Sequence, residues 1–458
     1  MIFYGREKEK KSLERFYSRT SQMAALIYGR RRVGKSELIK QSLRETDISS
    51  VYYECRQTTE MNNVESLSLL ISEKYGYPRL AFSKMEEVLD FLFRQAEKER
   101  LILVLDEYSY IRDVVKGMDS ILQVLIDQYK ETSQLKLIAC GSFVDTMKSL
   151  LLVQSPLYGR IDLTMELKPM DYYESALFYR TFSDEDKVKL YSVFGGIPYY
   201  NRLIDPALTV KENVINLIAS PGARLEMEIS MYLRSEVSKM VNANEVFDAL
   251  ARGYSRYSDI LSQSHVSSSP TLADTLEKLI RMELVRKEAP INDENNRRKS
   301  GYYIADSLSL FYYRYIFRYS SQMNVMEPEL FFDRYIKQDF EEKHVPRMFE
   351  EICRQYLIRQ NRRGRLEEPF EKIGTYYYDD PKKKMNGEFD IVTLDSKGYI
   401  FYEAKFRKAP LTRKLMEQEI AQVENSPLSC YKYGFFSRAG FESNMEHVMM
   451  FTLEDLFS

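Results

Sequence analysis

The sequence is poor in the residues that build metal centres and disulfide frameworks. It has only four cysteines and three histidines among 458 residues. Cys55, Cys140, Cys353 and Cys430 lie far apart without a CxxC pair, and the histidines do not fall at zinc-ligand spacing. These absences argue against a disulfide-stapled scaffold and against a structural zinc site, so we expect a reduced protein.

The sequence also lacks a long apolar run and an excess of either charge. Its longest apolar stretches, such as MAALIY and LILVL, are far too short to span a bilayer, and its opening MIFYGREKEKK has no apolar signal-peptide core. The formal net charge of −2 argues against a chain coated in basic residues, so nucleic acid must be contacted through local patches. We expect a cytoplasmic protein with no membrane partner.

The strongest motif that is present is a phosphate-binding loop. An apolar segment at 23–28 runs into the letters GRRRVGKS, which a helical pattern follows. This is G-x-x-x-x-G-K-S between a strand and a helix, the context in which the loop backbone surrounds nucleotide phosphates. Lys35 is expected to reach the β- and γ-phosphates of ATP, and Ser36 to ligate Mg²⁺. The nucleotide-binding residues assigned here are Gly29, Arg30, Arg31, Arg32, Val33, Gly34, Lys35, Ser36 and Glu37.

Two further apolar strands end in polar residues. LILVLDE is a continuous apolar run that ends in Asp106 and Glu107, as expected of a buried parallel strand that opens into a ligand crevice. Asp106 is expected to hold Mg²⁺ through water, and Glu107 to act as the general base. LKLIACGS ends in Ser142, which either senses the γ-phosphate or only terminates the strand.

These motifs, in this order, resemble STAND-type P-loop ATPases and their origin-recognition relatives. FYGREKE (3–9) is similar to the segment that precedes the loop in that group, and FGGIPYY (194–200) to the G-x-P element of its lid. The resemblance implies that Gly5 and Arg6 lie near the adenine and that Pro198 packs on the base or ribose edge.

SPLYGR (155–160) is similar to a segment of an archaeal and bacterial ATPase family that is fused to a DUF234-type C-terminal domain. Arg160 in this segment has two interpretations. It either stabilises transition-state charge at the nucleotide rim, in cis or from a neighbouring subunit, or it forms a structural ion pair.

A charged hairpin stands near the end of the chain. FDIVTLDSKGYIFYEAKF reads as two strands in which Glu403 and Lys405 share a face. Asp390 followed by Glu403-Ala-Lys405 has the D…E-x-K form of the PD-(D/E)XK nuclease fold, which the DUF234-type domain resembles. With Glu350 of an upstream helix, Asp390 and Glu403 are expected to bind Mg²⁺, and Lys405 to position or deprotonate water. The alternative is a degenerate scaffold, and the family's helix glutamine falls on either Gln418 or Gln422.

Basic residues are concentrated around this hairpin. Such runs engage DNA phosphates without regard to sequence, although they are also typical of solvated faces. The runs are Arg362–Arg365, Lys382–Lys384, Lys405–Lys408 and Arg413-Lys414.

The predicted fold is α/β multidomain. We expect a P-loop ASCE ATPase core with a parallel sheet (1–166), a helical lid with the GGIP element (167–222), a winged helix-turn-helix (223–305), an aromatic-rich connector (306–340) and a restriction-endonuclease-like α/β domain (341–458). The candidate reading helix of the winged module is expected to carry Thr271, Asp274, Thr275, Glu277 and Lys278 at its polar positions, and its two acids repel phosphate. Only the expected wing, NNRRKSG (295–301), is basic. A packing or switching role is therefore favoured over DNA reading. The connector aromatics are expected to fill core.

Three functions follow from these motifs. The first is an ATP-regulated, Mg²⁺-dependent nuclease that acts on DNA. The second is a regulatory, signalling-type ATPase whose C-terminal domain only binds DNA or a partner protein. The third is a ring-forming remodelling ATPase, which would be a homo-oligomer.

Overall fold

A computed structural model of the chain describes residues 2–78, 80–237, 242–294, 296, 299–380 and 385–458. These residues divide into two compact units. The N-terminal unit comprises Met1–Pro169 with Ile197–Tyr199, and the C-terminal unit comprises Met170–Gly196 with Tyr200–Ser458. The five-segment division expected from the sequence stays a prediction.

The N-terminal unit is built on a five-stranded parallel sheet. Its strands are β1 (Met23–Tyr28), β2 (Ser49–Glu54), β3 (Leu101–Asp106), β4 (Leu135–Gly141) and β5 (Leu163–Glu166). They lie in the order β2-β3-β4-β1-β5, and all their pairings are parallel. β3 and β4 are buried along their whole length, as expected of central strands that are covered on both faces.

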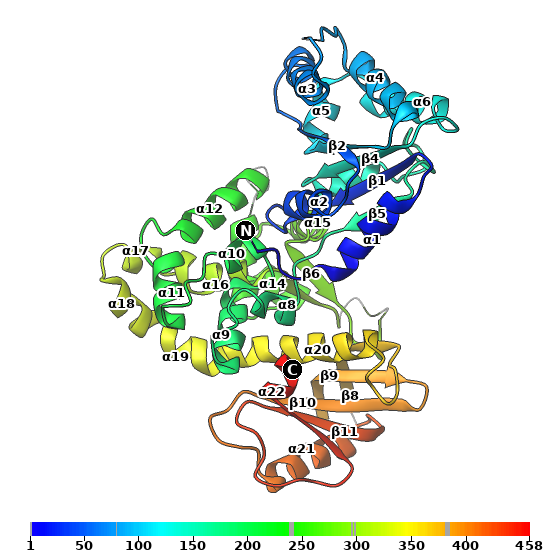
Figure 1. Ribbon diagram of the computed structural model, residues 1–458. Coiled ribbons are helices and arrows are strands. Elements are labelled where there is room, and N and C mark those ends of the chain that lie inside the picture. The colour runs from blue at the N-terminus through cyan, green and yellow to red at the C-terminus, as the bar shows by residue number, and fades with distance from the viewer. Residues whose placement is uncertain (1, 79, 238–241, 295, 297–298, 381–384) are drawn as a thin grey trace. The chain divides into compact units, whose positions relative to one another are not determined.

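Helices cover both faces of this sheet. They are α1 (Glu7–Ser18), α2 (Lys35–Arg44), α3 (Glu60–Tyr75), α4 (Met85–Lys98), α5 (Tyr108–Val114), α6 (Met118–Gln128) and α7 (Val144–Ser149). Figure 1 shows α1 and α2 on the opposite side of the sheet from α3, α4 and α6. On the latter side Leu103 and Leu137 of the sheet join Leu89 and Leu122 of the helices in one buried core. Burial of such side chains is the main stabilising contribution in a fold of this kind.

The sheet topology positions the candidate nucleotide site. β1, β3 and β4 are neighbours and parallel, so the loops that follow them emerge at the same edge of the sheet. The phosphate-binding loop follows β1, Glu107 follows β3 and Ser142 follows β4. The three motifs that the sequence separates by more than a hundred residues therefore converge.

Short helices begin the C-terminal unit. They are α8 (Tyr172–Ala176), α9 (Asp184–Phe194), α11 (Val210–Leu217) and α12 (Arg224–Val237). Between α9 and α11 in the chain, α10 (Pro198–Asn201) begins in the N-terminal unit and ends in the C-terminal unit. α9 begins at a capping Ser183, whose side chain accepts a hydrogen bond from the Asp186 backbone N–H. It ends at Gly195, whose φ of 60° and ψ of −152° suit only glycine. The next residue, Gly196, also requires a missing side chain, because an added Cβ would lie 2.0 Å from the Met170 carbonyl oxygen.

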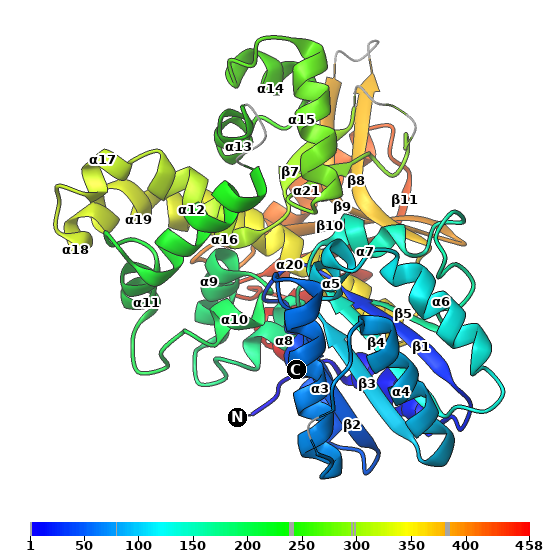
Figure 2. The same cartoon turned by 90° about the horizontal axis from the view of Figure 1, so that it is seen from above.

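The predicted helix-turn-helix with a wing is present in the C-terminal unit. Its elements are α13 (Ala243–Ala251), α14 (Tyr257–Gln263), α15 (Ser269–Arg281), β6 (Val285–Glu288) and β7 (Gly301–Ile304). Figure 2 shows α13, α14 and α15 grouped beside β7. The expectation that Thr275 lies on the polar face of α15 is wrong, because this side chain is buried and donates to the Thr271 carbonyl. Within the basic wing, residues 295, 297 and 298 lie outside the described part of the chain.

An aromatic segment follows the wing. It consists of α16 (Ser307–Phe311), α17 (Ser320–Met323), α18 (Pro328–Phe331) and α19 (Lys337–Asp339), with π-helical turns η1 (Tyr312–Phe317), η2 (Phe332–Ile336) and η3 (Phe340–His344). Phe311, Tyr313 and Tyr315 are almost fully buried. Arg314 forms two bonds to the Asp339 carboxylate, at 2.6 and 3.0 Å. The prediction that these aromatics fill core is confirmed for Phe311, Tyr312, Tyr313 and Tyr315, whereas Phe317 is exposed.

A second five-stranded sheet ends the chain. Its strands are β8 (Lys372–Asp380), β9 (Met385–Asp395), β10 (Gly398–Lys405), β11 (Cys430–Ser437) and β12 (Val448–Thr452), in the order β12-β11-β10-β9-β8. The sheet is mixed, since β8, β9 and β10 are antiparallel and β10, β11 and β12 are parallel. Its helices are α20 (Val345–Arg362), α21 (Arg413–Asn425) and α22 (Leu453–Phe457). The predicted hairpin is confirmed as β9–β10, and the Asp395 carboxylate accepts from the turn N–H groups of Lys397 and Gly398.

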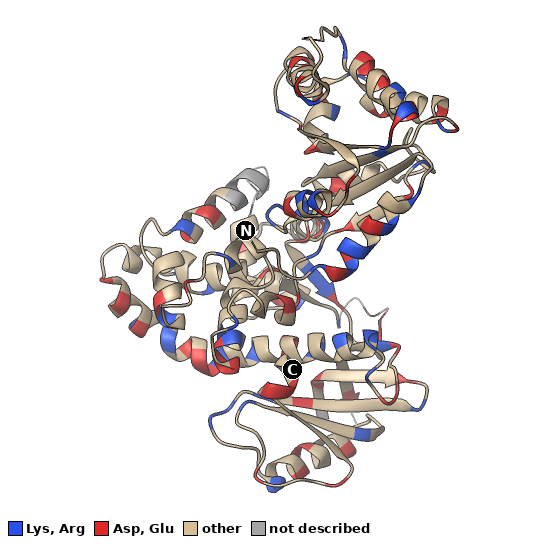
Figure 3. Ribbon diagram, viewed as in Figure 1, with Lys and Arg blue, Asp and Glu red and all other residues tan. Residues whose placement is uncertain are grey.

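Some global properties agree with the composition. Basic and acidic residues are interspersed along the helices, in keeping with the small net charge (Figure 3). All four cysteines are free thiols. Within the described residues, no helix has the length and apolar character needed to cross a membrane.

Candidate functional site

The phosphate-binding loop is held tightly against the end of β5. Gly29 has a φ of 153°, and a Cβ added there would lie 2.2 Å from the Leu167 carbonyl oxygen. Gly34, with a φ of 92°, directly precedes α2 and leaves the N-terminal N–H groups of that helix open toward the loop. Both glycines are therefore needed for backbone geometry, and the helix terminus faces the place where phosphate is expected.

Lys35 is buried within the loop. Its ammonium donates to the carbonyl oxygens of Gly29 and Arg30, at 2.9 and 3.0 Å, and to Ser142 Oγ at 2.9 Å. Burial lowers the pKa of the ammonium, an effect that the nearby carboxylates of Glu107 and Asp106 oppose. The side chain is thus fixed at the centre of the loop.

The carboxylate of Asp106 organises the adjoining oxygen atoms. Oδ2 accepts a hydrogen bond from Ser36 Oγ at 2.6 Å and another from the Tyr52 hydroxyl. Oδ1 accepts from the backbone N–H of Glu107 at 3.0 Å. Ser36 and Asp106, the two predicted Mg²⁺-site residues of the N-terminal unit, are therefore in direct contact.

Ser142 connects Lys35 with Glu107. Its hydroxyl accepts from the Lys35 ammonium and donates to Glu107 Oε1 at 2.6 Å, and its backbone N–H donates to Glu107 Oε2 at 3.2 Å. Glu107 itself has a left-handed backbone, with a φ of 52° and a ψ of 46°, which is uncommon for a residue other than glycine. The side chains that end β1, β3 and β4 thus form one continuous hydrogen-bonded network.

The donor set of this network fits a magnesium nucleotide. Mg²⁺ prefers oxygen ligands, and Ser36 and Asp106 supply a hydroxyl and a carboxylate side by side. The loop glycines and the start of α2 supply backbone N–H groups for phosphate oxygens. Lys35, Ser36 and Asp106 would hold the group, and Glu107, the expected base, lies next to them.

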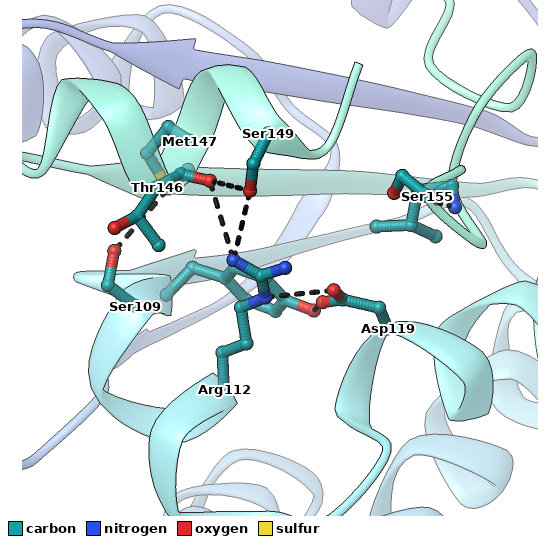
Figure 4. A network of polar contacts seen from close by, with 9 residues as sticks. Ser109, Arg112, Asp119, Thr146, Met147, Ser149 and Ser155 are labelled. Carbon is teal, nitrogen blue, oxygen red and sulfur yellow. Dashed lines mark hydrogen bonds and ion pairs between the residues drawn. The ribbon is translucent and has the colours of Figure 1, made fainter. Parts of the chain in front are cut away.

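A network of polar contacts fixes the helices that follow Glu107 and Ser142. Figure 4 shows the Arg112 guanidinium of α5 between Asp119 of α6, at 2.8 Å, and Ser149 of α7, at 3.1 Å. The Tyr108 hydroxyl donates to the other Asp119 oxygen at 2.7 Å. Since α5 begins directly after Glu107 and α7 shortly after Ser142, these bonds set the distance between the two strand ends.

Arg6 is a buried residue of the N-terminal segment. Its Nη2 donates to the Val33 carbonyl at 3.2 Å and to the Lys168 carbonyl at 2.6 Å, so it ties the phosphate-binding loop to the segment after β5. Both Gly5 and Arg6 have left-handed backbones, with φ of 67° and 63°. The placement of these two residues near adenine stays a prediction.

Pro198 lies beside the loop. A Cβ added at Gly34 would be 3.8 Å from Pro198 Cγ, which is ordinary van der Waals contact. The neighbouring Tyr199 ring stacks under the Arg32 guanidinium at 4.1 Å from the ring centroid. The contact of Pro198 with a nucleotide stays a prediction, but its position next to the loop agrees with it.

The remaining loop side chains differ in exposure. Arg30 is buried, whereas Arg31 is exposed and lies over the Phe143 ring at 5.4 Å. Val33 is fully buried, and Glu37 is half-buried in the first turn of α2.

Arg160 makes a two-pronged ion pair. Its Nε and Nη2 donate to the two carboxylate oxygens of Asp127 at 2.8 and 2.6 Å, and its Nη1 donates to the Pro156 carbonyl at 3.1 Å. Hydrogen bonding from Arg160 lowers the pKa of the Asp127 carboxyl. These contacts favour the structural interpretation, and a role at the nucleotide rim stays a prediction.

The C-terminal hairpin brings Glu403 and Lys405 together. The Lys405 ammonium lies 2.6 Å from Glu403 Oε1 and 2.9 Å from Glu419 Oε1 of α21. Burial raises the pKa of Glu403 to about 7, an effect that Lys405 opposes and that Glu419 and Asp390 reinforce. Glu419 rather than Gln418 or Gln422 is the α21 residue at this site, since both glutamines are exposed.

Glu350 and Asp390 complete the expected acidic set. Burial raises the pKa of Glu350 to about 8, and the charges of Asp390 and Glu403 add to this effect. Asp390 is the most exposed of the three. Nevertheless, among the residues that the structure describes, no group of three or more His, Cys, Asp or Glu side chains is arranged to hold a metal ion. In this arrangement the carboxylates do not fit the expected Mg²⁺, and their role as ligands stays a prediction.

The acidic residues border a cavity of about 450 Å³ in the C-terminal unit. Glu350 and Asp390 line it together with Arg286 of β6 and with Arg347 and Arg354 of α20. Across it, Arg286 pairs with Glu351 at 3.3 Å and Arg354 with Glu288 at 3.3 Å. These ion pairs fasten the wing strand β6 to α20, which agrees with a packing role for the winged module.

The described basic residues near the hairpin are largely exposed. They are Arg362, Arg363, Arg365, Arg407, Lys408, Arg413 and Lys414. Arg413 pairs with Glu417 at 2.8 Å. Lys382–Lys384, the run placed before the metal-binding strand, lies outside the described residues.

Sequence reasoning missed two residues that contact the predicted sites. Tyr52 reaches Asp106 from β2, and Glu419 reaches Lys405 from α21. For Glu419 the sequence carries a signal, because this residue lies on α21, the helix expected to carry the family's glutamine. For Tyr52 the only signal was its place near the end of a parallel strand next to β3.

Comparisons with known proteins agree with this architecture. Residues 3–203 match the model of an ATPase domain predominantly from Archaea, and residues 312–423 match DUF234, a family of archaeal and bacterial proteins of unknown function. The uncharacterized protein MJECL04 of Methanocaldococcus jannaschii is a relative with 26% identity over 409 aligned residues. The alignment covers 89% of this chain and 88% of the relative.

Among solved structures, the Walker-type ATPase PABY2304 of Pyrococcus abyssi is similar to this chain, with a TM-score of 0.51 and a sequence identity of 22%. The superposition covers 68% of this chain and 96% of the PABY2304 chain. The Aeropyrum pernix ORC2 protein follows with a TM-score of 0.47 and 14% identity over 70% of this chain and 95% of that one. The first of these likenesses supports the fold.

The fold and the loop define a multidomain α/β protein with a P-loop ATPase domain and a separate C-terminal mixed-sheet domain. The chain has the architecture in which the archaeal-type ATPase domain is fused to a DUF234 domain.

Proposed function

We propose that the protein is an ATP-binding and ATP-hydrolysing switch whose nucleotide state controls its C-terminal domain. The observation that carries the proposal is the Ser142 bridge, because it connects the phosphate-binding Lys35 with the expected base Glu107. A group that enters the loop would compete for the Lys35 ammonium and so alter both bonds. Binding at the loop would then reach the strand end that holds the base.

The chain provides a covalent route from the nucleotide to the C-terminal unit. In the segment Phe194–Tyr200, Gly195 and Gly196 belong to the C-terminal unit, and Ile197–Tyr199 belong to the N-terminal unit. Pro198, expected at the base or ribose edge, is therefore two residues from a glycine pair of the other unit. A change at Pro198 is expected to be passed to α9 through this segment.

For the C-terminal domain, the first candidate function is a Mg²⁺-dependent DNA nuclease. Asp390, Glu403, Lys405 and Glu350 lie at one end of the sheet, and exposed basic residues surround the hairpin. In this proposal Glu350, Asp390 and Glu403 would have to move together to hold the metal, which would activate water for phosphodiester hydrolysis, and Lys405 would orient that water. DNA would be held through its phosphates, which explains why basic runs rather than a reading helix are found.

The second candidate is a domain that only binds DNA or a partner protein. The bridge from Lys405 to both Glu403 and Glu419 favours it, since an ammonium held by two carboxylates is fixed as in a structural ion network. The ATPase would then act in regulation or signalling.

One experiment separates the two candidates. The full-length protein is incubated with plasmid DNA and Mg²⁺, with and without ATP, beside the Lys35→Ala and Asp390→Asn variants. The nuclease proposal expects the wild-type protein to cleave the plasmid. Asp390→Asn should abolish this cleavage, and in Lys35→Ala the cleavage should no longer depend on ATP. DNA binding without cleavage in any lane would support the non-catalytic domain. ATP hydrolysis that survives Lys35→Ala would contradict the ATPase assignment.

Light scattering with and without ATP tests the ring-forming alternative.

A further inference from the structure

Tyr52 is a residue of the nucleotide site that no motif includes. It lies on β2, whose strand neighbour is β3, and its hydroxyl donates to Oδ2 of Asp106. Ser36 donates to the same oxygen at 2.6 Å. One carboxylate oxygen thus receives two hydroxyl hydrogen bonds from two different elements.

The hydrogen-bond inventory of Asp106 shows what this contact does. An ionised carboxylate has about four acceptor positions. Ser36 and Tyr52 occupy Oδ2, and the Glu107 backbone N–H occupies one position of Oδ1. The carboxylate is therefore fixed by hydrogen bonds from three directions. A carboxylate held in this way offers a single orientation to a metal-bound water.

The surroundings of the Tyr52 ring also fix the hydroxyl. The Lys40 ammonium of α2 lies 4.9 Å from the ring centroid. Lys40 is one helical turn after Ser36, so α2 contributes both the hydroxyl that shares the Asp106 oxygen and the cation that covers the ring. Tyr52 is thereby fixed between β3 and α2.

We infer that Tyr52 is a positioning residue of the Mg²⁺ site, which holds the Asp106 carboxylate in the orientation that binds the metal of a magnesium nucleotide. This inference rests on the nucleotide site proposed above and extends it to a residue on a strand that carries no motif. It concerns the coupling between metal and nucleotide, since the polar contacts of Tyr52 are with Asp106 and Ser36, the two residues expected at the Mg²⁺ site.

The chain provides a matched control at the next position. Tyr53 has the same side chain on the same strand, but it points to the opposite face and its hydroxyl donates to Asn63 Oδ1 at 2.6 Å. Tyr53→Phe therefore removes an identical hydroxyl without touching Asp106. Any general effect of losing a tyrosine hydroxyl from β2 appears in both variants.

The test measures ADP binding to the full-length protein by isothermal titration calorimetry, in EDTA and at a series of Mg²⁺ concentrations. In EDTA, wild type, Tyr52→Phe and Tyr53→Phe are expected to bind ADP with the same affinity. With Mg²⁺, Tyr52→Phe is expected to need about tenfold more metal for the same gain in affinity, as follows from the loss of one hydrogen bond to a charged group. Tyr52→Met, which also lacks the hydroxyl, is a second variant with the same expectation.

A double-mutant cycle adds a readout that a purely structural role would not move. In an Asp106→Asn background, loss of the Tyr52 hydroxyl is expected to leave the Mg²⁺ dependence unchanged, because the partner is already altered. An unchanged Mg²⁺ dependence in Tyr52→Phe, or an equal change in Tyr53→Phe, would overturn the inference. Absence of any ADP binding by wild type would instead overturn the proposed nucleotide site itself.

Discussion

At the residue scale, the nucleotide site depends on side chains that each make two contacts. Ser142 accepts from Lys35 and donates to Glu107, and Asp106 joins Ser36 to the backbone of Glu107. In a site of this kind the loss of one side chain disturbs its two neighbours. The chemical role of each residue therefore has to be tested with replacements that keep the shape.

Glu107→Gln is the sharpest of these replacements. The amide keeps the size of the side chain and can still pair with Ser142, but it cannot take a proton from water. ATP binding is expected to be retained, while turnover falls about a hundredfold or more, the usual contribution of a general base. Radiolabelled ATP hydrolysis and equilibrium binding measure the two quantities.

Glu54→Gln is the control for this variant. Glu54 is the exposed β2 residue that pairs in register with Asp106, so it lies near the site without contacting the loop. It is expected to hydrolyse ATP at the wild-type rate. If Glu107→Gln did the same, Glu107 would not be the base.

Lys405 permits a second prediction about a single residue. Lys405→Met leaves the half-buried carboxylates of Glu403 and Glu419 without their shared cation. If the ion network is structural, the free energy of unfolding falls by about 2 kcal/mol, at the lower end for a broken buried pair because these groups keep some exposure. Thermal melts in EDTA measure the loss.

Melts with Mg²⁺ then separate the ion network from a metal site. Asp390→Asn and Glu403→Gln are expected to be as stable as wild type, or slightly more so, if the carboxylates repel one another in the absence of metal. A Mg²⁺-dependent rise in Tm that wild type has and both variants lack would support metal binding. Equal melting curves with and without Mg²⁺ in all proteins would count against it.

The sequence was most informative where a motif fixes backbone and side chain together. Loop spacing and strand ends predict that Lys35, Ser36 and Asp106 lie at the same edge of the sheet, and the structure places them in one network of contacts, while their roles toward a nucleotide stay predictions. Tyr52 and Glu419 were missed because their contacts cross from one element to another, and no local pattern encodes a long-range contact. The sequence also leaves open whether Arg160 forms a structural ion pair or acts at the nucleotide rim. Its partner Asp127 is 33 residues away, and no local pattern encodes that contact.

At the element scale, the sequence predicted type and order better than detail. β1, β3 and β4 and the β9–β10 hairpin follow from apolar runs and turn residues. By contrast, the π-helical turns η1, η2 and η3 have no pattern of their own in the sequence. The buried Thr275 shows the same limit, since polarity alone does not tell which face of a helix is covered.

The segment that contains Pro198 is the element whose alteration tests the switch. Pro198→Ala removes the ring that lies beside the loop but leaves Gly195 and Gly196 in place. ATP and ADP affinities are expected to fall about fivefold, while turnover at saturating ATP stays within twofold, because the expected contact of Pro198 is with the base end of the ligand and not with the reacting phosphate. Steady-state kinetics and equilibrium binding give both values.

Pro206→Ala is a control in an exposed turn of the C-terminal unit. It is expected to leave both affinities unchanged. Unchanged ADP and ATP affinities in Pro198→Ala would remove this segment from the nucleotide site.

At the scale of the whole molecule, the C-terminal unit contains a histidine that couples folding to pH. His344 is buried among the rings of Phe311, Tyr315 and Phe340, and its Nε2 lies 2.9 Å from the Ser192 carbonyl. Burial lowers its pKa to about 4, which the Ser192 carbonyl partly opposes. The folded protein therefore keeps this ring neutral in mild acid.

The sign of the pH effect follows from this lowered pKa. Between about pH 6.5 and pH 4 the unfolded chain binds a proton at His344 that the folded chain does not, so the free energy of unfolding falls as the pH falls. The full contribution is about 3 kcal/mol at the acid end of this window. His344→Gln is expected to lose less stability than wild type between these two pH values, whereas His447→Gln, at an exposed position, should behave as wild type. Denaturant melts of the three proteins across this pH range measure the effect. If wild type, His344→Gln and His447→Gln lost stability equally, His344 would not be the source of the pH dependence.

The order of the strands in the N-terminal sheet has a consequence for protein synthesis. β1 leaves the ribosome before the other four strands of its sheet, but its two neighbours are β4 and β5, which end at Gly141 and Glu166. More than a hundred residues separate the end of β1 at Tyr28 from the start of β4 at Leu135, so the strand that leads into the phosphate-binding loop cannot pair until these have been made. Long-range pairing of this kind is slow and leaves apolar strand edges exposed in the nascent chain. The candidate nucleotide site cannot be assembled before β4 and the Ser142 that follows it have been translated, so nucleotide can stabilise this unit only after that point.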